Sequence, residues 1–219
     1  MVEPRLLIDI EFFRGFEGAA LDELVISAES RVFNRGDVIF TESDEATELF
    51  VVESGRIAIA NKSIDGRESV VALMEQGDLF GEMALFDRHS RSAEARALET
   101  STVAAIPYGP LRSIYDRRPE LLWNVVELLA GRLRHTNEGL ADSVFLDVTG
   151  RTAKRLLELA GEADEFSLPI TQEELAGMVG ASRERVNKAI ASFVRLGWIE
   201  QSDRRYRITK RDELSRRAR

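Results

Sequence analysis

The sequence predicts an α+β protein with a β-rich N-terminal domain, one long helix and a compact C-terminal helical domain. Short apolar stretches separated by glycine-containing turns run from residue 29 to about 107, which is typical of a β-sandwich or small barrel. Apolar residues then recur every three or four positions from 119 to 145, which indicates a helix. Two short helices and a hairpin pattern follow. We therefore expect domains at 1–118, 119–146 and 147–219.

Composition narrows the classes of function. The chain of 219 residues has no cysteine and only two histidines, His89 and His135. This excludes disulfides, thiolate metal sites, cysteine-ligated iron–sulfur clusters and a cysteine nucleophile, and it leaves little for a histidine-built metal site or a catalytic triad. Since there is also no P-loop and no H-E-x-x-H motif, we predict neither a metal nor an enzyme. We find no signal peptide and no apolar run of the ~20 residues that span a membrane, and expect a cytoplasmic protein.

The charge is unevenly distributed along the chain. The net charge is −8, which argues against a nucleic-acid partner for the chain as a whole. Residues 150–219, however, hold 15 Lys and Arg against 11 Asp and Glu, whereas residues 1–149 hold 15 against 27. The basic C-terminal segment therefore keeps nucleic-acid binding open.

The β-rich region predicts a series of short strands after one short helix, LDELVISA. Turns are expected at Asn34–Asp37, Gly55, Asp65–Gly66 and Gly77–Asp78. The predicted strands are RVF, VIF, ELFVVES, RIAIA, ESVVALM, LFGEMALF, SAEARAL and STVAAIP.

The long helix has two apolar flanks. One flank steps by four and three residues, the spacing of a coiled-coil seam, and consists of Leu122, Val126, Leu129, Leu133, Thr136 and Leu140. The other flank consists of Leu121, Val125 and Leu128. An amphipathic helix lying only on its own β-domain would explain one flank. We favour a homodimer in which the first flank faces the partner and the second faces the β-domain.

The C-terminal region carries the signals of a winged helix-turn-helix. Asp147 can cap a helix that runs to Leu159, with 147–150 as the joint between domains, and EADEFSLPI predicts a loop. Thr171 and Glu174 form a capping box for the next helix. Gly180 permits the tight turn and Ser182 can cap the following helix. WIEQ and YRITK then predict a hairpin, or wing.

Charged residues crowd the start of the second helix of this motif. They are Arg183, Glu184, Arg185, Asn187 and Lys188. A helix fits the major groove of DNA, where Arg and Lys donate to guanine and Glu accepts from cytosine. A solvated helix face is also rich in charge, but it explains neither this clustering nor the basic hairpin that follows. We therefore predict DNA binding.

The segment GEMALFDRHSRSA, residues 81–93, places a carboxylate and an arginine nine residues apart. Arg91 could hold a phosphate together with backbone N–H groups, and Glu82 could accept a hydrogen bond from a hydroxyl. The alternative is a surface ion pair, which would mean little.

Three segments resemble a known family. FGEMALFDRHSRSAEARA resembles the phosphate-binding cassette of cyclic-nucleotide-binding domains, and FLDVTGRTAKRLLELA with ITQEELAGMVGASRERVNKAI resembles the hinge and helix-turn-helix of the cyclic AMP receptor protein (CRP/FNR) family. The run RLRHTNEGLAD is similar to actinobacterial CRP-type regulators. The resemblance spans nearly the whole chain. It implies a β-roll (jelly-roll) cyclic-nucleotide-binding domain, a dimerisation helix and a winged helix-turn-helix domain.

The resemblance also implies roles for individual residues. The ligand would be cyclic AMP or cyclic GMP, with Glu82 on the ribose 2′-hydroxyl and Asn137 contributed by the partner subunit. The expected ligand-binding residues are Gly81, Glu82, Met83, Ala84, Arg91, Ser92, Thr136 and Asn137. Those expected at DNA are Thr171, Gln172, Ser182, Arg183, Glu184, Arg185, Asn187 and Lys188, with Arg183, Glu184 and Lys188 on a GTG-like half-site.

Three residues depart from the pattern of the family, two of them in comparison with its best-known enteric member. Asn137 replaces a serine, Lys188 replaces an arginine, and Arg185 stands where threonine is common. These departures leave the choice of cyclic nucleotide and the operator sequence open. The absent cysteines exclude an iron–sulfur sensor, and a haem sensor would have only His89 in its loops.

We therefore predict a cytoplasmic homodimeric transcription regulator that binds a palindromic operator in double-stranded DNA, with RNA polymerase as a partner by resemblance and no membrane contact. Two alternatives stay open. One is a DNA-binding regulator of the same fold that needs no cyclic nucleotide. The other is a nucleotide-binding regulatory protein with a vestigial DNA module.

Overall fold

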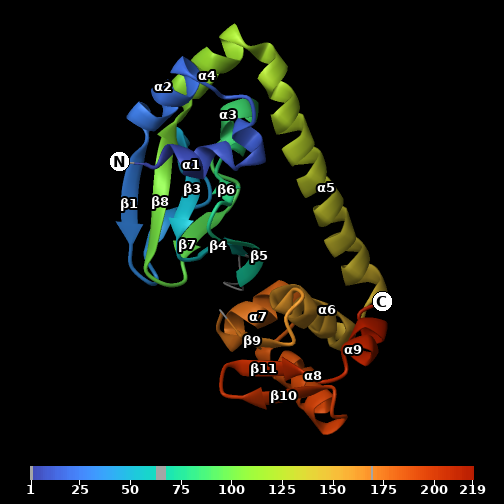
Figure 1. Ribbon diagram of the computed structural model, residues 1–219. Coiled ribbons are helices and arrows are strands. Elements are labelled where there is room, and N and C mark those ends of the chain that lie inside the picture. Colours follow the sequence, from blue (N-terminus) through green and yellow to red (C-terminus); the bar gives the residue numbers. More distant parts are fainter. Residues whose placement is uncertain (1, 63–67, 169) are drawn as a thin grey trace. The chain divides into compact units, whose positions relative to one another are not determined.

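The computed structural model describes residues 2–62, 68–168 and 170–219 (Figure 1). The chain divides into two compact units. The first comprises residues 1–61 and 71–133, and the second comprises residues 62–70 and 134–219. The mixed fold confirms the predicted α+β class.

Two four-stranded sheets form the centre of the first unit. One sheet has the order β1-β8-β3-β6 and the other β2-β7-β4-β5. The central pair of the first sheet, β3 and β8, is antiparallel and aligns Phe50 with Ala105. The strands are β1 (Glu29–Phe33), β2 (Val38–Phe40), β3 (Glu48–Ser54), β4 (Ile57–Lys62), β5 (Glu68–Met74), β6 (Leu79–Phe80), β7 (Glu94–Ala97) and β8 (Ser101–Pro107).

Helices and aromatic side chains cover one face of the sheet β1-β8-β3-β6. Residues from α2 and α4 pack with the inner side chains of β3 and β8 in one apolar cluster, where Phe12 and Phe13 meet edge to face at 4.9 Å. The helices are α1 (Pro4–Ile8), η1 (Glu11–Phe13), α2 (Ala19–Ser27), α3 (Met83–Asp87), α4 (Tyr108–Arg117) and η2 (Pro119–Leu121). The helix predicted at LDELVISA is confirmed as α2.

The long helix α5 (Leu122–Phe145) has 24 residues and two different apolar flanks. Leu121 and Val125 are buried and Leu128 packs against the cluster of the first unit, as predicted for the inner flank. The outer flank is exposed along its length, with Leu133 62 % and Leu140 64 % exposed. The inner flank therefore fixes the helix on its own sheets and leaves the outer flank for another surface.

The second unit contains the remaining elements. Three helices meet around a small core that includes Leu156, Ala176, Val186 and Phe193. Its sheet has the order β10-β11-β9. The elements are α6 (Val148–Ala160), β9 (Glu165–Ser167), α7 (Gln172–Val179), α8 (Arg183–Arg195), β10 (Ile199–Ser202), β11 (Arg205–Ile208) and α9 (Arg211–Arg217).

The short C-terminal helix α9 closes onto the start of α6. Asp147 caps α6 by accepting a hydrogen bond from the Gly150 N–H at 2.8 Å, and its carboxylate also pairs with Arg217. The hydrogen bond from Gly150 is the main cause that lowers the pKa of Asp147, and Arg217 adds to it. The last helix therefore holds the joint that was predicted at 147–150.

The predicted boundaries are wrong in three places. EADEFSLPI is not all loop, because β9 pairs with β11 and Phe166 stacks on Tyr206 at 5.5 Å. LFGEMALF is a strand only at Leu79–Phe80 and then turns into α3. Residues 119–121 form a 3-10 turn, so the long helix begins at Leu122. The turn predicted at Asp65–Gly66 lies outside the described residues.

Candidate nucleotide and DNA sites

Arg91 lies buried under the turn that joins β6 to α3. Its side chain is 6 % exposed, and its Nη1 and Nη2 atoms donate to the carbonyl oxygens of Gly81 and Glu48, each at 2.8 Å. The guanidinium also lies over the Phe40 ring, 4.1 Å from its centroid. All these partners are uncharged, and among the described residues Arg91 makes no ion pair. Its buried Nε atom has no hydrogen-bond partner there.

Glu82 is the matching carboxylate, nine residues earlier. It is fully buried, and its Oε1 atom accepts from Nη1 of Arg132 at 2.5 Å. Its Oε2 atom is buried and has no hydrogen-bond partner among the described residues. The structure therefore does not pair Glu82 with Arg91, so the surface ion pair considered from the sequence is absent. Each group instead keeps one buried polar atom for a further partner.

Arg132 is a residue of this site that sequence reasoning missed. It extends from α5, pairs with Glu82 and donates through Nη2 to the Leu79 carbonyl at 2.5 Å. It stands first in the run RLRHTNEGLAD, and nothing in its local sequence separates it from Arg134. The signal exists only in space, because α5 passes the turn that carries Glu82.

The other predicted ligand residues lie in different units: four of them surround Arg91 in sequence in the first unit, and two lie on the part of α5 that belongs to the second unit. Gly81 has a φ of +77°, and a Cβ atom there would lie 2.6 Å from Arg91 Nη1, so only glycine suits this position. Met83 and Ser92 are exposed and Ala84 is buried; the Ser92 hydroxyl lies 3.9 Å from the Met83 sulfur. Thr136 and Asn137 are exposed on α5, in the second unit. Their predicted contact with a purine stays a prediction.

The helix-turn-helix forms as predicted. The capping box is present, with the Thr171 hydroxyl accepting from the Glu174 N–H and the Glu174 carboxylate accepting from the Thr171 N–H. Gly180 takes the left-handed conformation at the turn, with a φ of +67°. Ser182 caps α8. These local contacts fix where the second helix begins and therefore which of its residues come first.

The start of α8 presents its charged side chains to solvent. Its buried face consists of Val186, Ala189 and Ile190. The exposed residues are those predicted to contact DNA, namely Arg183, Glu184, Arg185, Asn187 and Lys188. Among the described residues, these five side chains take part in no hydrogen bond or ion pair. They differ in this from the arginines that hold the domain together, such as Arg151 and Arg211.

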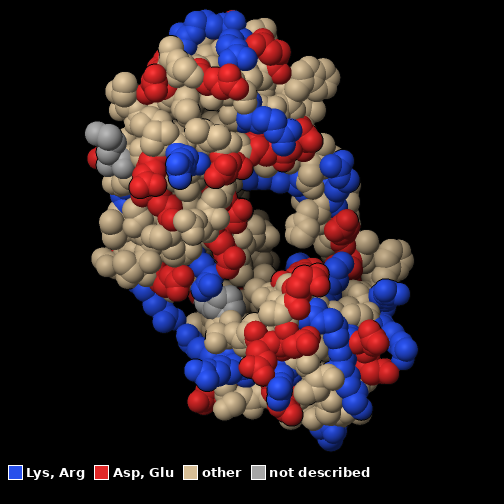
Figure 2. Space-filling view, in the orientation of Figure 1, with Lys and Arg blue, Asp and Glu red and all other residues tan. Residues whose placement is uncertain are grey.

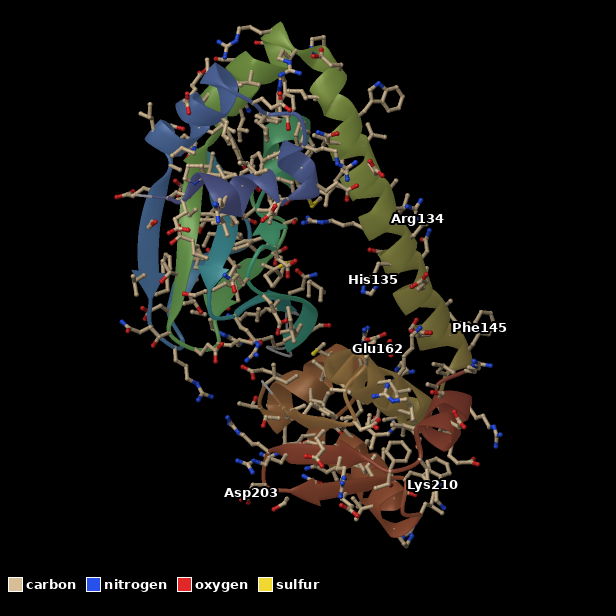
Figure 3. All side chains as sticks on the ribbon, in the orientation of Figure 1. Arg134, His135, Phe145, Glu162, Asp203 and Lys210 are labelled. Carbon is tan, nitrogen blue, oxygen red and sulfur yellow. The ribbon has the colours of Figure 1, made fainter. Side chains whose placement is uncertain are left out.

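The wing follows as a three-stranded sheet. Asp203 lies at the turn between β10 and β11 (Figure 3), and Arg204 and Arg205 follow it in the sequence. Tyr206 is buried, and its hydroxyl accepts from the side-chain amides of Gln172 at 2.8 Å and Gln201 at 3.1 Å. Thr171 and Gln172, two of the predicted DNA contacts, therefore also have roles inside the domain.

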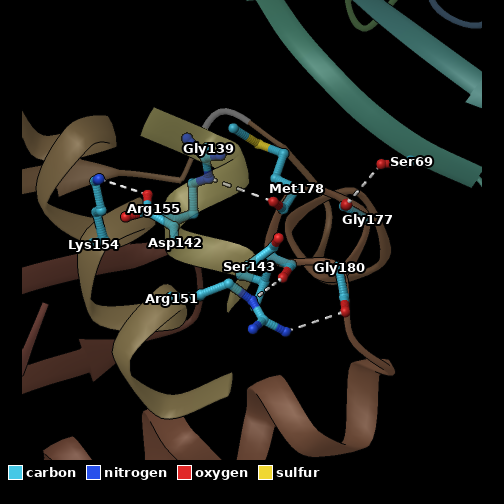
Figure 4. Close-up of a pocket in the computed structure, with 11 residues that line it drawn as sticks. Ser69, Gly139, Asp142, Ser143, Arg151, Lys154, Arg155, Gly177, Met178 and Gly180 are labelled. Carbon is cyan, nitrogen blue, oxygen red and sulfur yellow. Dashed lines mark hydrogen bonds and ion pairs between the residues drawn. The ribbon is translucent and has the colours of Figure 1, made fainter. Parts of the chain in front are cut away.

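A small pocket of about 170 Å³ lies beside the helix-turn-helix (Figure 4). Its cations are already engaged. Lys154 pairs with Asp142 at 2.5 Å, Arg155 pairs with Glu158 at 2.5 Å, and Arg151 donates to the carbonyl oxygens of Val179 and Leu146. The bond from Arg151 to Val179 ties α6 to the helix-turn-helix, and the other contacts lie within α6 or join it to the end of α5.

Comparison with known proteins identifies two domains in the chain. The model of the cyclic nucleotide-binding domain matches residues 30–118, and the model of the Crp-like helix-turn-helix domain matches residues 150–217. The CRP-like cAMP-activated global transcriptional regulator of Mycobacterium tuberculosis is 38 % identical over 214 residues, which cover 94 % of this chain and 96 % of the relative. The chain belongs to the CRP/FNR family of transcription regulators.

Further relatives confirm the CRP/FNR fold. The cAMP-activated global transcriptional regulator Vfr of Pseudomonas aeruginosa is 33 % identical over 189 residues, covering 82 % of this chain and 88 % of the relative. The structure of FixK2 from Bradyrhizobium japonicum matches with a TM-score of 0.79 at 21 % identity, covering 86 % of this chain and 96 % of that one. The first shows the family, and the second shows the shared fold.

CRP/FNR membership places the chain among regulators rather than enzymes, as predicted. The residues described contain no group of three or more potential metal ligands. No helix among them is long and apolar enough to cross a membrane. On the face seen in Figure 2, acidic and basic residues are interspersed on the surface.

Proposed function

We propose that this chain is a regulator that binds a cyclic nucleotide, cyclic AMP in the first place, and that the ligand controls its binding to operator DNA. One observation carries the nucleotide part. Arg91 and Glu82 are both buried, and each has one polar atom without a hydrogen-bond partner among the described residues. A buried guanidinium with uncharged partners attracts an anion, and a buried carboxylate oxygen accepts from a hydroxyl.

A cyclic nucleotide offers both groups on one small molecule. Its phosphate pairs with Arg91, assisted by Ser92 and by backbone N–H groups from Gly81 to Ala84, and its ribose 2′-hydroxyl donates to Glu82. Arg132 holds the Glu82 carboxylate in place through Oε1, which leaves Oε2 for the sugar. The assignment of Thr136 to the purine is supported by its place one turn after Arg132 on α5, and Asn137 is expected to come from the partner subunit.

The DNA part of the proposal is supported by the unpaired side chains of α8. Arg183, Glu184 and Lys188 contact base edges in the major groove, and Ser182 contacts phosphate. The protein acts as a homodimer through the exposed flank of α5, so its two α8 helices meet half-sites about 34 Å apart on a palindromic operator. The ligand shifts the population toward the arrangement of the α5 helices that allows this spacing. RNA polymerase is the expected further partner, in the cytoplasm.

Calorimetry on the full chain tests the nucleotide part. Cyclic AMP, cyclic GMP and adenosine are titrated into the wild type and into two variants of the same loop, Arg91→Gln and Arg88→Gln. Each variant removes one positive charge, but Arg88 is exposed whereas Arg91 is buried. We expect at least about a tenfold loss of cyclic AMP affinity for Arg91→Gln, the scale of one charge-assisted hydrogen bond, and little change for Arg88→Gln.

Absence of heat with either cyclic nucleotide at millimolar concentration would contradict the nucleotide part and favour a regulator that needs no ligand. Circular dichroism of each variant establishes that it is folded.

A gel shift on a palindromic GTG-type site tests the DNA part. Arg183→Ala is compared with Arg195→Ala, which removes an exposed arginine from the last turn of the same helix. Loss of one base contact costs about 1–3 kcal/mol, so affinity for the cognate site should fall about 5- to 150-fold only for Arg183→Ala. Equal binding of cognate and scrambled DNA by the wild type would contradict sequence-specific recognition.

A further inference from the structure

Tyr108 is a buried polar residue of the first unit that the proposed function has not yet used. It is the first residue of α4 and is 3 % exposed. Its backbone N–H donates to the Thr47 carbonyl at 2.9 Å, which fixes the position of the ring. Its hydroxyl donates to the Gly81 carbonyl and accepts from Arg91 Nη1 at 3.3 Å. The ring therefore places one hydroxyl between two parts of the predicted phosphate site.

The Gly81 carbonyl accepts hydrogen bonds from both Tyr108 and Arg91. Because the C=O and N–H of a trans peptide point in opposite directions, these two donors also fix the direction of the Glu82 N–H. That N–H is turned away from Tyr108 and Arg91, toward the other side of the turn. Fixing the peptide plane thus prepares a backbone donor as well as the arginine.

The neutral state of the Tyr108 hydroxyl suits this role. Burial raises the pKa of Tyr108, although the nearby Arg91 charge acts in the opposite direction. A neutral hydroxyl can donate to Gly81 and still accept from Arg91 without neutralising the guanidinium. A carboxylate at the same place would compete with an incoming phosphate for the positive charge.

We propose that Tyr108 is a positioning residue for the nucleotide phosphate: its hydroxyl holds the Gly81 peptide and the Arg91 guanidinium in the arrangement that receives the anion. This inference rests on the proposed function, since it concerns the same site. Tyr108 does not contact the ligand itself. It acts through the two groups that do.

Tyr115 provides a matched control on the same helix. It is 6 % exposed, and burial raises its pKa too. Its hydroxyl, however, has no hydrogen-bond partner among the described residues. Tyr108→Phe and Tyr115→Phe therefore remove the same atom from two buried rings, and only the first removal breaks contacts at the site.

The test is calorimetry of the full chain with cyclic AMP and, as a probe without phosphate, adenosine. We expect Tyr108→Phe to weaken cyclic AMP binding about threefold to tenfold, as for the loss of one neutral hydrogen bond. Adenosine binding should be unchanged by either variant, and Tyr115→Phe should bind both ligands as the wild type does. A merely structural role would lower both affinities of Tyr108→Phe together, which would overturn the inference.

Two other results are distinguishable. In the first, the wild type binds cyclic AMP and Tyr108→Phe binds it with an affinity within about twofold of the wild type, a change smaller than the loss of one hydrogen bond. That result refutes the positioning role and leaves the proposed function standing. If the wild type binds no cyclic nucleotide, the proposed function itself fails. A thermal melt of each variant establishes that the phenylalanine is accommodated in the core.

Discussion

Asp147 allows a sharp test of the contacts that hold the start of α6, namely its helix cap and its ion pair with Arg217 of α9. Asp147→Ala removes the cap of α6 and the pair with Arg217, whereas Arg217→Ala removes only the pair. An N-cap contributes about 1 kcal/mol. The pair contributes about 0.5 kcal/mol, because Asp147 is 63 % and Arg217 33 % exposed in their side chains and solvent screens them. We therefore expect the free energy of local opening at the start of α6 to fall by about 1.5 kcal/mol in Asp147→Ala, which loses the cap and the pair, and by about 0.5 kcal/mol in Arg217→Ala, which loses the pair alone.

Hydrogen exchange on the peptide that spans residues 146–156 of the full chain measures this local opening. Asp147→Ala should exchange about tenfold faster than the wild type, and Arg217→Ala about twofold faster. The control is Arg216→Ala, which changes the neighbour of Arg217 on α9. Arg216 forms an exposed pair with Glu213 at 3.0 Å within α9 and not with Asp147. If Asp147→Ala exchanged no faster than Arg216→Ala, the clamp at the joint would be refuted.

The same residue predicts a pH dependence with a definite sign. The pKa of Asp147 is lowered in the folded chain, mainly by the Gly150 N–H. The contribution of the Asp147 carboxylate to stability is therefore complete above its pKa in the unfolded chain, about 3.9, and is lost as the pH falls through its lower pKa in the folded chain. The difference in stability between the wild type and Asp147→Ala should be present at pH 7 and should shrink below about pH 4. A difference that stayed constant down to the lowest pH of the native state would contradict this origin.

Three further predictions concern other parts of the chain. Leu133→Asp should leave the monomer folded, because this side chain is 62 % exposed, and should abolish dimers in analytical ultracentrifugation; dimers that persist would refute the seam. Val186→Ala should lower the free energy of unfolding by about 2 kcal/mol in urea titration, since the side chain is fully buried; no loss would contradict its place in the core. Gly81→Ala should lose cyclic AMP binding in calorimetry, because its φ is +77° and its Cβ would meet Arg91; retained affinity would contradict the tight turn.

The features that could be predicted from the sequence are those fixed by neighbours in the chain. Asp147, the Thr171–Glu174 box and Ser182 cap their helices because each contact closes over three residues. The inner and outer flanks of α5 follow from the helical period. The exposed cluster on α8 follows from its buried face in the same way.

The features that were missed depend on contacts between distant residues. β9 exists because it pairs with β11 about 40 residues later, and its own sequence has too little apolar pattern to show it. Arg132 joins the site only because α5 passes Glu82, 50 positions away. Tyr108 belongs to the site for the same reason, since Gly81 is 27 positions away. Such contacts leave no local signal.

The two flanks of α5 have a consequence for the length of this helix. Val125 and Val126 are adjacent in sequence but belong to different flanks, because successive residues of an α-helix stand about 100° apart around its axis. Rolling α5 about its axis would expose the buried Val125 side chain, at a cost of about 1.5–3 kcal/mol. One inserted or deleted residue between Val125 and Leu133 would rotate Leu133 by about 100° around the helix axis relative to Val125, and so break the outer flank. Evolution can therefore exchange the side chains of this segment more freely than it can change their number.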